Sequence, residues 1–247
     1  MGSKTVVLAP MGTSPPVITE FVEYFMRRNI KITDIAIFTT KNNIVRYSTD
    51  FVRIALKIRY PYIHTDIIEF DFEDTLTTED NISFMRTIAD YIVGYREKNP
   101  DSRIYLNVAG GRKNMCITLS ILGQIAGVNG IYHVVNENYK SINERMNETS
   151  MKMRIEEIHR AKTEEKKIQL YKNEQGKYDS LLFPDEREYS LIQIPMIPYS
   201  KKYLKKIISD IESNNIPEEL INKDIISSKD VLTDINKNIM EIISKLI

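Results

Sequence analysis

The sequence has almost no cysteine, no excess of charge of either sign and no long hydrophobic run. Its single cysteine, Cys116, excludes an intrachain disulfide and is typical of a reducing compartment, so we expect a cytoplasmic protein. Basic and acidic residues number 34 each, so no global field attracts nucleic acid or an anionic membrane, and any anion site must be local. No stretch approaches the roughly 18 apolar residues of a membrane span, and Met1–Pro10 lacks the hydrophobic region of a signal peptide. We therefore expect neither a membrane nor duplex DNA as a partner.

Signatures of common cofactors and metals are also missing. No G-x-G-x-x-G follows the first apolar run and no Walker motif occurs, which argues against a nicotinamide cofactor and a P-loop. The three histidines, His64, His133 and His159, are scattered, with no H-E-x-x-H motif and no paired cysteines, so we expect no metal site. A Ser–His–Asp triad stays open, but no G-x-S-x-G elbow supports one.

Short apolar runs alternate with stretches of helical periodicity over the first 135 residues. The runs predict strands at 5–9, 35–39, 65–70, 103–108 and 130–135. The periodic stretches predict helices at 15–28, 48–60, 78–98 and 114–126, the first of them capped by Ser14. This alternation is typical of a parallel sheet covered on both faces, so the sequence predicts a Rossmann-like α/β domain.

The composition changes after Asn136. Residues 137–180 are rich in charge and carry only a thin apolar stripe, which indicates an inserted, partly exposed helical or hairpin excursion. Strand character returns at 191–195 and helical character at 200–211. We therefore expect one domain over residues 1–211 and a helical tail over 212–247.

Two loops join a predicted strand to a predicted helix and present free N–H groups. They are Met11–Pro16, with the hydroxyls of Thr13 and Ser14, and Ala109–Lys113, with two glycines, Arg112 and Lys113. Both should lie at the carboxyl edge of the sheet, where open α/β folds bind ligands, and helix N-termini there favour phosphate. Each loop alone is equally well explained as a tight turn. Cations at a helix N-terminus are unfavourable, however, and an anion between Arg112 and Lys113 would resolve the conflict.

A second basic cluster places Lys201 and Lys202 at the start of a predicted helix, directly after a strand. Here a merely basic, exposed helix face is as good an explanation as an anion site, since Lys205 and Lys206 follow.

At these residues the chain resembles CARF domains, the Rossmann-like sensors of cyclic oligoadenylates in type III CRISPR systems, and above all the stand-alone archaeal CRISPR ring nucleases. The resemblance rests on Gly12-Thr-Ser-Pro-Pro16, on Asn107-Val-Ala-Gly-Gly-Arg-Lys113 and, least specifically, on the Pro198-Tyr-x-Lys-Lys segment, and it spans roughly residues 4 to 211. It implies a homodimer that binds cyclic tetra-adenylate on its two-fold axis, without a cofactor.

The same resemblance implies metal-independent cleavage of the ring to linear di-adenylate ending in a 2′,3′-cyclic phosphate. Ser14 matches the family's positioning serine, and either Lys201 or Lys202 its essential lysine. The predicted ligand-binding residues are Gly12, Thr13, Thr39, Thr40, Lys41, Asn107, Gly110, Gly111, Arg112 and Lys113. If the two lysines fail, Lys41 and Arg46 are the next cations on that edge.

Two alternatives stay open. One is a sensor that holds the ring without cutting it and signals through the tail, and the other is an unrelated nucleotide-binding Rossmann enzyme. The tail lacks a basic recognition helix and the R-x4-6-H motif of attached ribonuclease domains.

Overall fold

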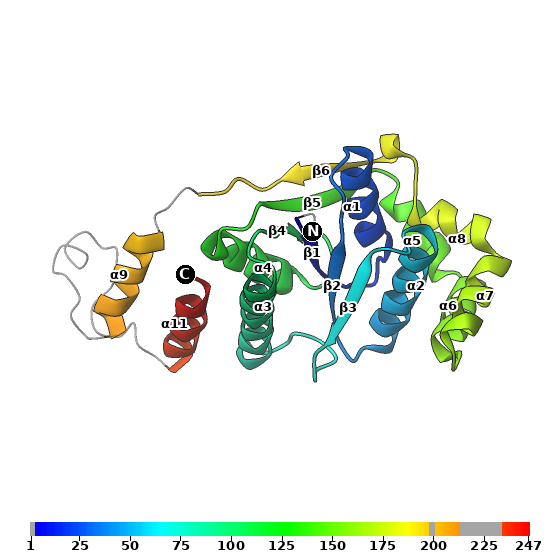
Figure 1. The fold of residues 1–247 in the computed structure, drawn as a ribbon. Coiled ribbons are helices and arrows are strands. Elements are labelled where there is room, and N and C mark those ends of the chain that lie inside the picture. Colours follow the sequence, from blue (N-terminus) through cyan, green and yellow to red (C-terminus); the bar gives the residue numbers. More distant parts are fainter. Residues whose placement is uncertain (1–2, 198–200, 213–233) are drawn as a thin grey trace.

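The computed structural model describes residues 3–197, 201–212 and 234–247. At its centre lies one six-stranded sheet in the order β3-β2-β1-β4-β5-β6 (Figure 1). Strands β1 to β5 run parallel, and β6 runs antiparallel to β5 at the edge. The predicted Rossmann-like α/β fold is therefore confirmed, with an antiparallel edge strand added. The strands are β1 (Thr5–Pro10), β2 (Asp34–Thr39), β3 (His64–Glu69), β4 (Arg103–Asn107), β5 (Gly130–Asn136) and β6 (Tyr189–Gln193).

The central strands are buried on both faces. Val7 and Ile35 point into a core shared with the first two helices, whereas Leu8 and Phe38 point into a second core on the opposite face. All four side chains are 0% exposed. Because successive strand residues alternate between faces, such strands become the continuous apolar runs seen in the sequence. The covering helices are α1 (Pro16–Arg27) and α2 (Asn43–Arg59) on one face, and α3 (Thr78–Lys98) and α4 (Lys113–Ala126) on the other.

Helix α2 begins earlier than the predicted residue 48. The Asn42 side chain caps it by accepting hydrogen bonds from the backbone N–H groups of Ile44 (3.0 Å) and Val45 (3.3 Å). Asparagine is a favoured cap because its oxygen satisfies donors that the first turn leaves free. The start of α2 therefore lies beside the end of β2, at the carboxyl edge of the sheet.

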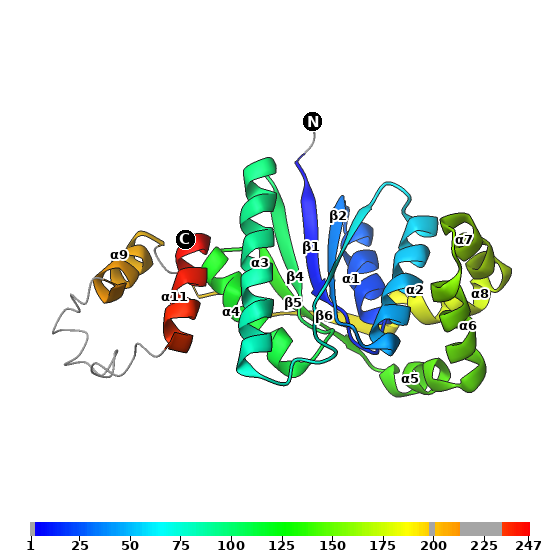
Figure 2. The ribbon, with the colours of Figure 1, turned by 90° about the horizontal axis from the view of Figure 1, so that it is seen from below.

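The charged segment after β5 folds into short helices that pack beside α2 (Figures 1 and 2). Met146 and Ile155 are buried in the α2 core, whereas Met153 is 66% exposed. Arg53 of α2 bonds both carboxylate oxygens of Glu164, at 2.5 and 2.7 Å. Of the two predicted forms, helical and hairpin, the segment adopts the helical one, and most of its apolar stripe is buried against the α2 core. The helices are α5 (Tyr139–Asn147), α6 (Thr149–Arg160), α7 (Glu164–Asn173) and α8 (Gln175–Leu182).

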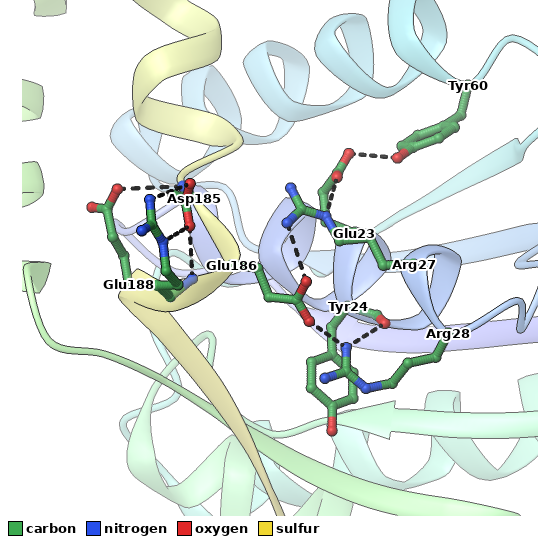
Figure 3. Close-up of polar contacts among 9 residues, drawn as sticks. Glu23, Tyr24, Arg27, Arg28, Tyr60, Asp185, Glu186 and Glu188 are labelled. Carbon is green, nitrogen blue, oxygen red and sulfur yellow. Dashed lines mark hydrogen bonds and ion pairs between the residues drawn. The ribbon is translucent and has the colours of Figure 1, made fainter.

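A 3-10 turn, η1 (Glu186–Glu188), joins this segment to β6. Its Glu186 carboxylate accepts hydrogen bonds from Arg28 (2.9 Å) and Arg27 (3.4 Å) at the end of α1 (Figure 3). Arg27 also bonds Glu23 one turn earlier, at 3.3 Å. These contacts tie η1, and with it the start of β6, to α1.

Helix α11 (Asp234–Leu246) packs against α3 near the C-terminus. Ile242 is 0% exposed and Leu246 4% exposed, and Lys245 bonds Asp90 at 3.1 Å. Helix α9 (Lys201–Glu212) lies beyond α11 (Figure 1). The predicted tail is thus helical over 234–246, while 213–233 fall outside the described residues. The boundary between the predicted domain and the tail, at residue 211, stays a prediction.

Candidate functional site

The loop between β1 and α1 holds Ser14 next to the α5 helix. Pro15 occupies the N-cap position of α1, which begins at Pro16 without any side-chain cap, so the predicted capping by Ser14 is wrong. The half-buried Ser14 hydroxyl instead donates a hydrogen bond to Asn143 Oδ1 of α5 at 3.1 Å. It also borders a cavity of about 200 Å³ that Glu20 lines. The hydroxyl therefore links the first loop to α5 instead of capping α1.

The β4–α4 loop lies against this first loop, and glycine permits the close approach. A Cβ on Gly110 would lie 2.1 Å from the Pro10 carbonyl oxygen, and a Cβ on Gly12 would lie 2.8 Å from the Gly111 nitrogen. Gly111 also has φ +80°, a conformation that favours glycine. No side chain fits at these points without moving the backbone. The structure thus brings the two predicted loops together at one edge of the sheet.

Asn107, the last residue of β4, holds the start of α1 and the β4–α4 loop in place through two hydrogen bonds. Its side chain is 0% exposed, donates to the Val17 carbonyl at 2.9 Å and accepts from the Ala109 N–H at 3.0 Å. Both polar atoms of the amide have partners, so Asn107 orders the loops rather than presenting its own side chain to a ligand.

A cavity of about 220 Å³ opens where the loops meet. It gathers five of the predicted ligand residues from three different loops, together with acidic side chains of the β3–α3 loop. The predicted residues that line it are Gly12, Thr13, Thr40, Gly111 and Arg112. Of the others, Thr39 is 1% exposed and accepts a hydrogen bond from the Thr49 hydroxyl at 3.0 Å, and Lys113 is exposed at the start of α4.

Two of the predicted ligand-binding cations, Arg112 and Lys41, have acidic partners. Arg112 Nε bonds Asp74 Oδ1 at 2.7 Å, and its Nη2 contacts the second carboxylate oxygen. This bidentate pair holds the pKa of Asp74 below its usual range. It also explains how Arg112 is accommodated at a helix N-terminus without an anion. Lys41 likewise pairs with Asp71 at 2.9 Å.

Arg46 is neutralised in the same way, since its Nε bonds Glu69 at 2.6 Å. A phosphate ligand that met Arg112, Lys41 or Arg46 would therefore have to share or displace the carboxylate paired with that cation.

The two predicted catalytic lysines lie apart from Ser14 within one chain. Since β6 is antiparallel, its end at Gln193 pairs with Tyr132, and the next backbone N–H, of Ile194, bonds Ile131 near the start of β5. The chain thus leaves the sheet at the amino edge, opposite to the two loops. In both views α9 stands at the far end of the molecule from α1 (Figures 1 and 2). Lys202 is exposed on α9.

The Lys201 side chain and residues 198–200, which include Pro198 and Tyr199 of the lysine motif, lie outside what the structure describes.

Three residues were missed by sequence reasoning: Asn143, which bonds Ser14, Lys152, which lines a cavity together with Asn143 and Thr13, and Glu20, which lines a cavity with Ser14. The first two lie in the charged segment, whose docking on α2 depends on contacts distant in sequence. Glu20 is 1% exposed on α1, and burial raises its pKa to about 7. The helical spacing of Glu20 with the apolar residues Val17 and Phe21 could have revealed its buried position.

The structure offers no candidate for metal binding in its described part, where no cluster of three or more His, Cys, Asp or Glu side chains occurs. Cys116 is half-buried, and burial raises the pKa of its thiol to about 11. Among the helices described, none is long and apolar enough to cross a membrane.

Comparison with known proteins assigns the chain to a family. The family model described as CRISPR-associated protein NE0113 matches residues 14–226, which is most of the chain and begins at Ser14 of the first loop. The chain belongs to this family.

Two known proteins are similar to the chain. The CRISPR system ring nuclease SSO2081 of Saccharolobus solfataricus is 24% identical over 147 residues, which cover 58% of this chain and 78% of that protein. The structure of Enterococcus italicus Csm6 bound to cyclic hexa-2′-fluoro-hexa-dAMP is similar with a TM-score of 0.48 and 14% identity. That similarity covers 99% of this chain, which spans 56% of the Csm6 chain. The resemblance to CRISPR ring nucleases inferred from the sequence motifs is confirmed.

Proposed function

We propose that this protein is a ring nuclease that binds cyclic tetra-adenylate at the carboxyl edge of its sheet and cleaves it to linear di-adenylate, which would switch off type III CRISPR signalling. One observation carries the proposal. In a member of a CRISPR-associated family, a serine in the loop before α1 bonds Asn143 of α5 and lines a cavity, beside two glycine loops in close contact. Such an edge is where open α/β sheets bind ligands.

The proposed chemistry needs little from the protein. A ribose 2′ oxygen attacks the adjacent phosphorus and loses its proton, the bond from phosphorus to the 5′ oxygen breaks, and that oxygen takes up a proton. The product ends in a 2′,3′-cyclic phosphate, and two such cuts divide the ring into two halves. Since the nucleophile is internal to the substrate, rotation of the ribose into line supplies much of the rate. Hydrogen-bond donors such as Ser14 would stabilise charge on the phosphate oxygens.

We also propose that the active form is a homodimer. The ring carries four phosphates, whereas Arg112, Lys41 and Arg46 of one chain are each paired with a carboxylate. Two copies around a two-fold axis would double the donors and match the symmetry of the ring.

A second candidate is a sensor that binds the ring without cutting it. The position of α9 favours it, because this helix, which carries Lys202, lies far from α1 in the same chain (Figures 1 and 2). If catalysis required that lysine, a partner copy would have to supply it.

Incubation of the purified protein with radiolabelled cyclic tetra-adenylate in EDTA separates these functions. The proposal expects linear di-adenylate with a 2′,3′-cyclic phosphate. Retention of the intact ring supports the sensor, and no binding at all overturns both. Because EDTA is present throughout, cleavage would also establish that no metal is required.

A further inference from the structure

A cavity separate from the loop junction lies between the first loop, α2 and the α5–α6 pair. Its volume is about 440 Å³, and its lining includes Tyr47, Met146, Lys152 and Ile155. We call it the α5–α6 cavity. Met146 and Ile155 are buried and form apolar walls, while Lys152 is exposed at its border. An aromatic ring and aliphatic side chains next to a cation suit a nucleoside with its phosphate.

The α5–α6 cavity adjoins the candidate site through two shared residues. Thr13 lines both this cavity and the cavity at the loop junction. Asn143 lines it as well and accepts the hydrogen bond from the Ser14 hydroxyl. A ligand phosphate near Ser14 would therefore lie at the border of the α5–α6 cavity.

Lys152 differs from three of the cations predicted at this edge. Its ammonium has no carboxylate partner among the described residues, whereas Arg112, Lys41 and Arg46 each have one. The acid that borders the same cavity, Glu156, is already bonded to Arg160 at 2.6 Å. Lys113 is also exposed and lacks a described acid partner, but it lines neither cavity that Thr13 borders.

We propose that Lys152 is the cation that contacts the ligand phosphate beside Ser14, and that the α5–α6 cavity receives the adjoining adenosine. This inference rests on the proposed function. It assigns to the charged segment the cationic role that the sequence motifs suggest for Lys201 or Lys202. The ammonium keeps its proton throughout and acts only by attracting the charge on the phosphate oxygens, so no bond to the protein is made or broken.

The test compares four proteins by titration calorimetry with cyclic tetra-adenylate and by single-turnover cleavage in EDTA: wild type, Lys152→Ala, Lys152→Arg and Lys162→Ala. Lys162 is the matched control, because it is an exposed lysine of the same segment that does not line the α5–α6 cavity. Lys152→Ala should weaken binding by about tenfold or more, since a charge-assisted contact is lost. Lys152→Arg should restore most of it, and Lys162→Ala should match wild type.

The outcomes distinguish this inference from the proposed function. If wild type binds and cleaves the ring while Lys152→Ala does so equally well, the role of Lys152 is refuted and the proposed function stands. Equal losses in Lys152→Ala and Lys162→Ala would indicate a general effect of charge and would also refute it. If wild type binds no ring, both fail. A circular dichroism melt checks that each variant is folded.

Discussion

Replacement of Glu20 by glutamine should stabilise the protein at alkaline pH and leave it nearly unchanged in acid. The Glu20 carboxyl is 1% exposed, one oxygen accepts from Asn136 at 2.6 Å, and the other has no partner among the described residues. Burial is the largest cause that raises its pKa from 4.5 to about 7, and the charge of Glu188 adds to it. Burial favours the neutral acid because a carboxylate loses its hydration there.

The sign and size follow from proton linkage. Because the folded-state pKa lies above the unfolded value, the stabilising contribution is fully present below pH 4.5 and is lost as pH rises through about 7. A rise of about 2.5 pKa units, at about 1.4 kcal/mol per unit, corresponds to about 3 kcal/mol. Glutamine cannot ionise, so Glu20→Gln should gain up to about 3 kcal/mol over wild type by pH 8.5.

The assay is urea unfolding of both proteins between pH 4.5 and 8.5, followed by circular dichroism. Glu23→Gln on the same helix is the contrasting variant. Glu23 is 3% exposed and bonds Arg59 at 2.6 Å as well as the Tyr60 hydroxyl (Figure 3 shows the tyrosine contact), so its loss should destabilise the protein across this range. If the difference between Glu20→Gln and wild type is the same at pH 5 and pH 8, the account of Glu20 is refuted.

Three further substitutions test the loops, and a fourth in α3 serves as a contrast. Arg112→Ala should weaken cyclic tetra-adenylate binding by about tenfold or more in a filter-binding assay, because a charge-assisted phosphate contact is lost; unchanged affinity would leave Arg112 as a structural partner of its aspartate only. Gly110→Ala should cost about 1–3 kcal/mol in urea unfolding, because its Cβ would meet Pro10. Gly94→Ala should instead stabilise α3 by about 0.5–1 kcal/mol, because nothing lies within 4 Å of its Cβ; a loss there would contradict this account. Asn107→Ala should cost about 1–3 kcal/mol, since it leaves buried backbone groups unpaired, and an unaffected midpoint would contradict its role.

Local patterns in the sequence were sufficient to predict the parallel strands and the loops at their carboxyl ends. The runs at 5–9 and 35–39 are continuous because both faces of those strands are buried, and this signal is contained in the run itself. Parallel strands bring their carboxyl ends to one edge, so the amino-acid sequence alone was enough to predict that the Gly12 and Gly110 loops both lie at that edge. Their contact depends on β1 and β4 being neighbours in the sheet.

Other features depend on contacts that no short stretch records. The partner of Arg112 is Asp74, 38 residues away, and the partner of Ser14 is Asn143, 129 residues away. The direction of β6 is likewise not encoded in its own residues, because the side chains of a strand alternate in the same way whichever way it runs. Its antiparallel course leads Lys202 away from the loops.

The proposed function is tested most directly by single-turnover cleavage of cyclic tetra-adenylate by Ser14→Ala, measured beside its affinity for the ring. If Ser14 positions the scissile group, the contact strengthens in the transition state, and cleavage should slow by about a hundredfold while affinity changes far less. Ser83→Ala, at an exposed serine of α3, serves as the control and should cleave like wild type. Cleavage by Ser14→Ala at the wild-type rate would contradict the account, because the hydroxyl at the centre of the candidate site would then take no part in the reaction.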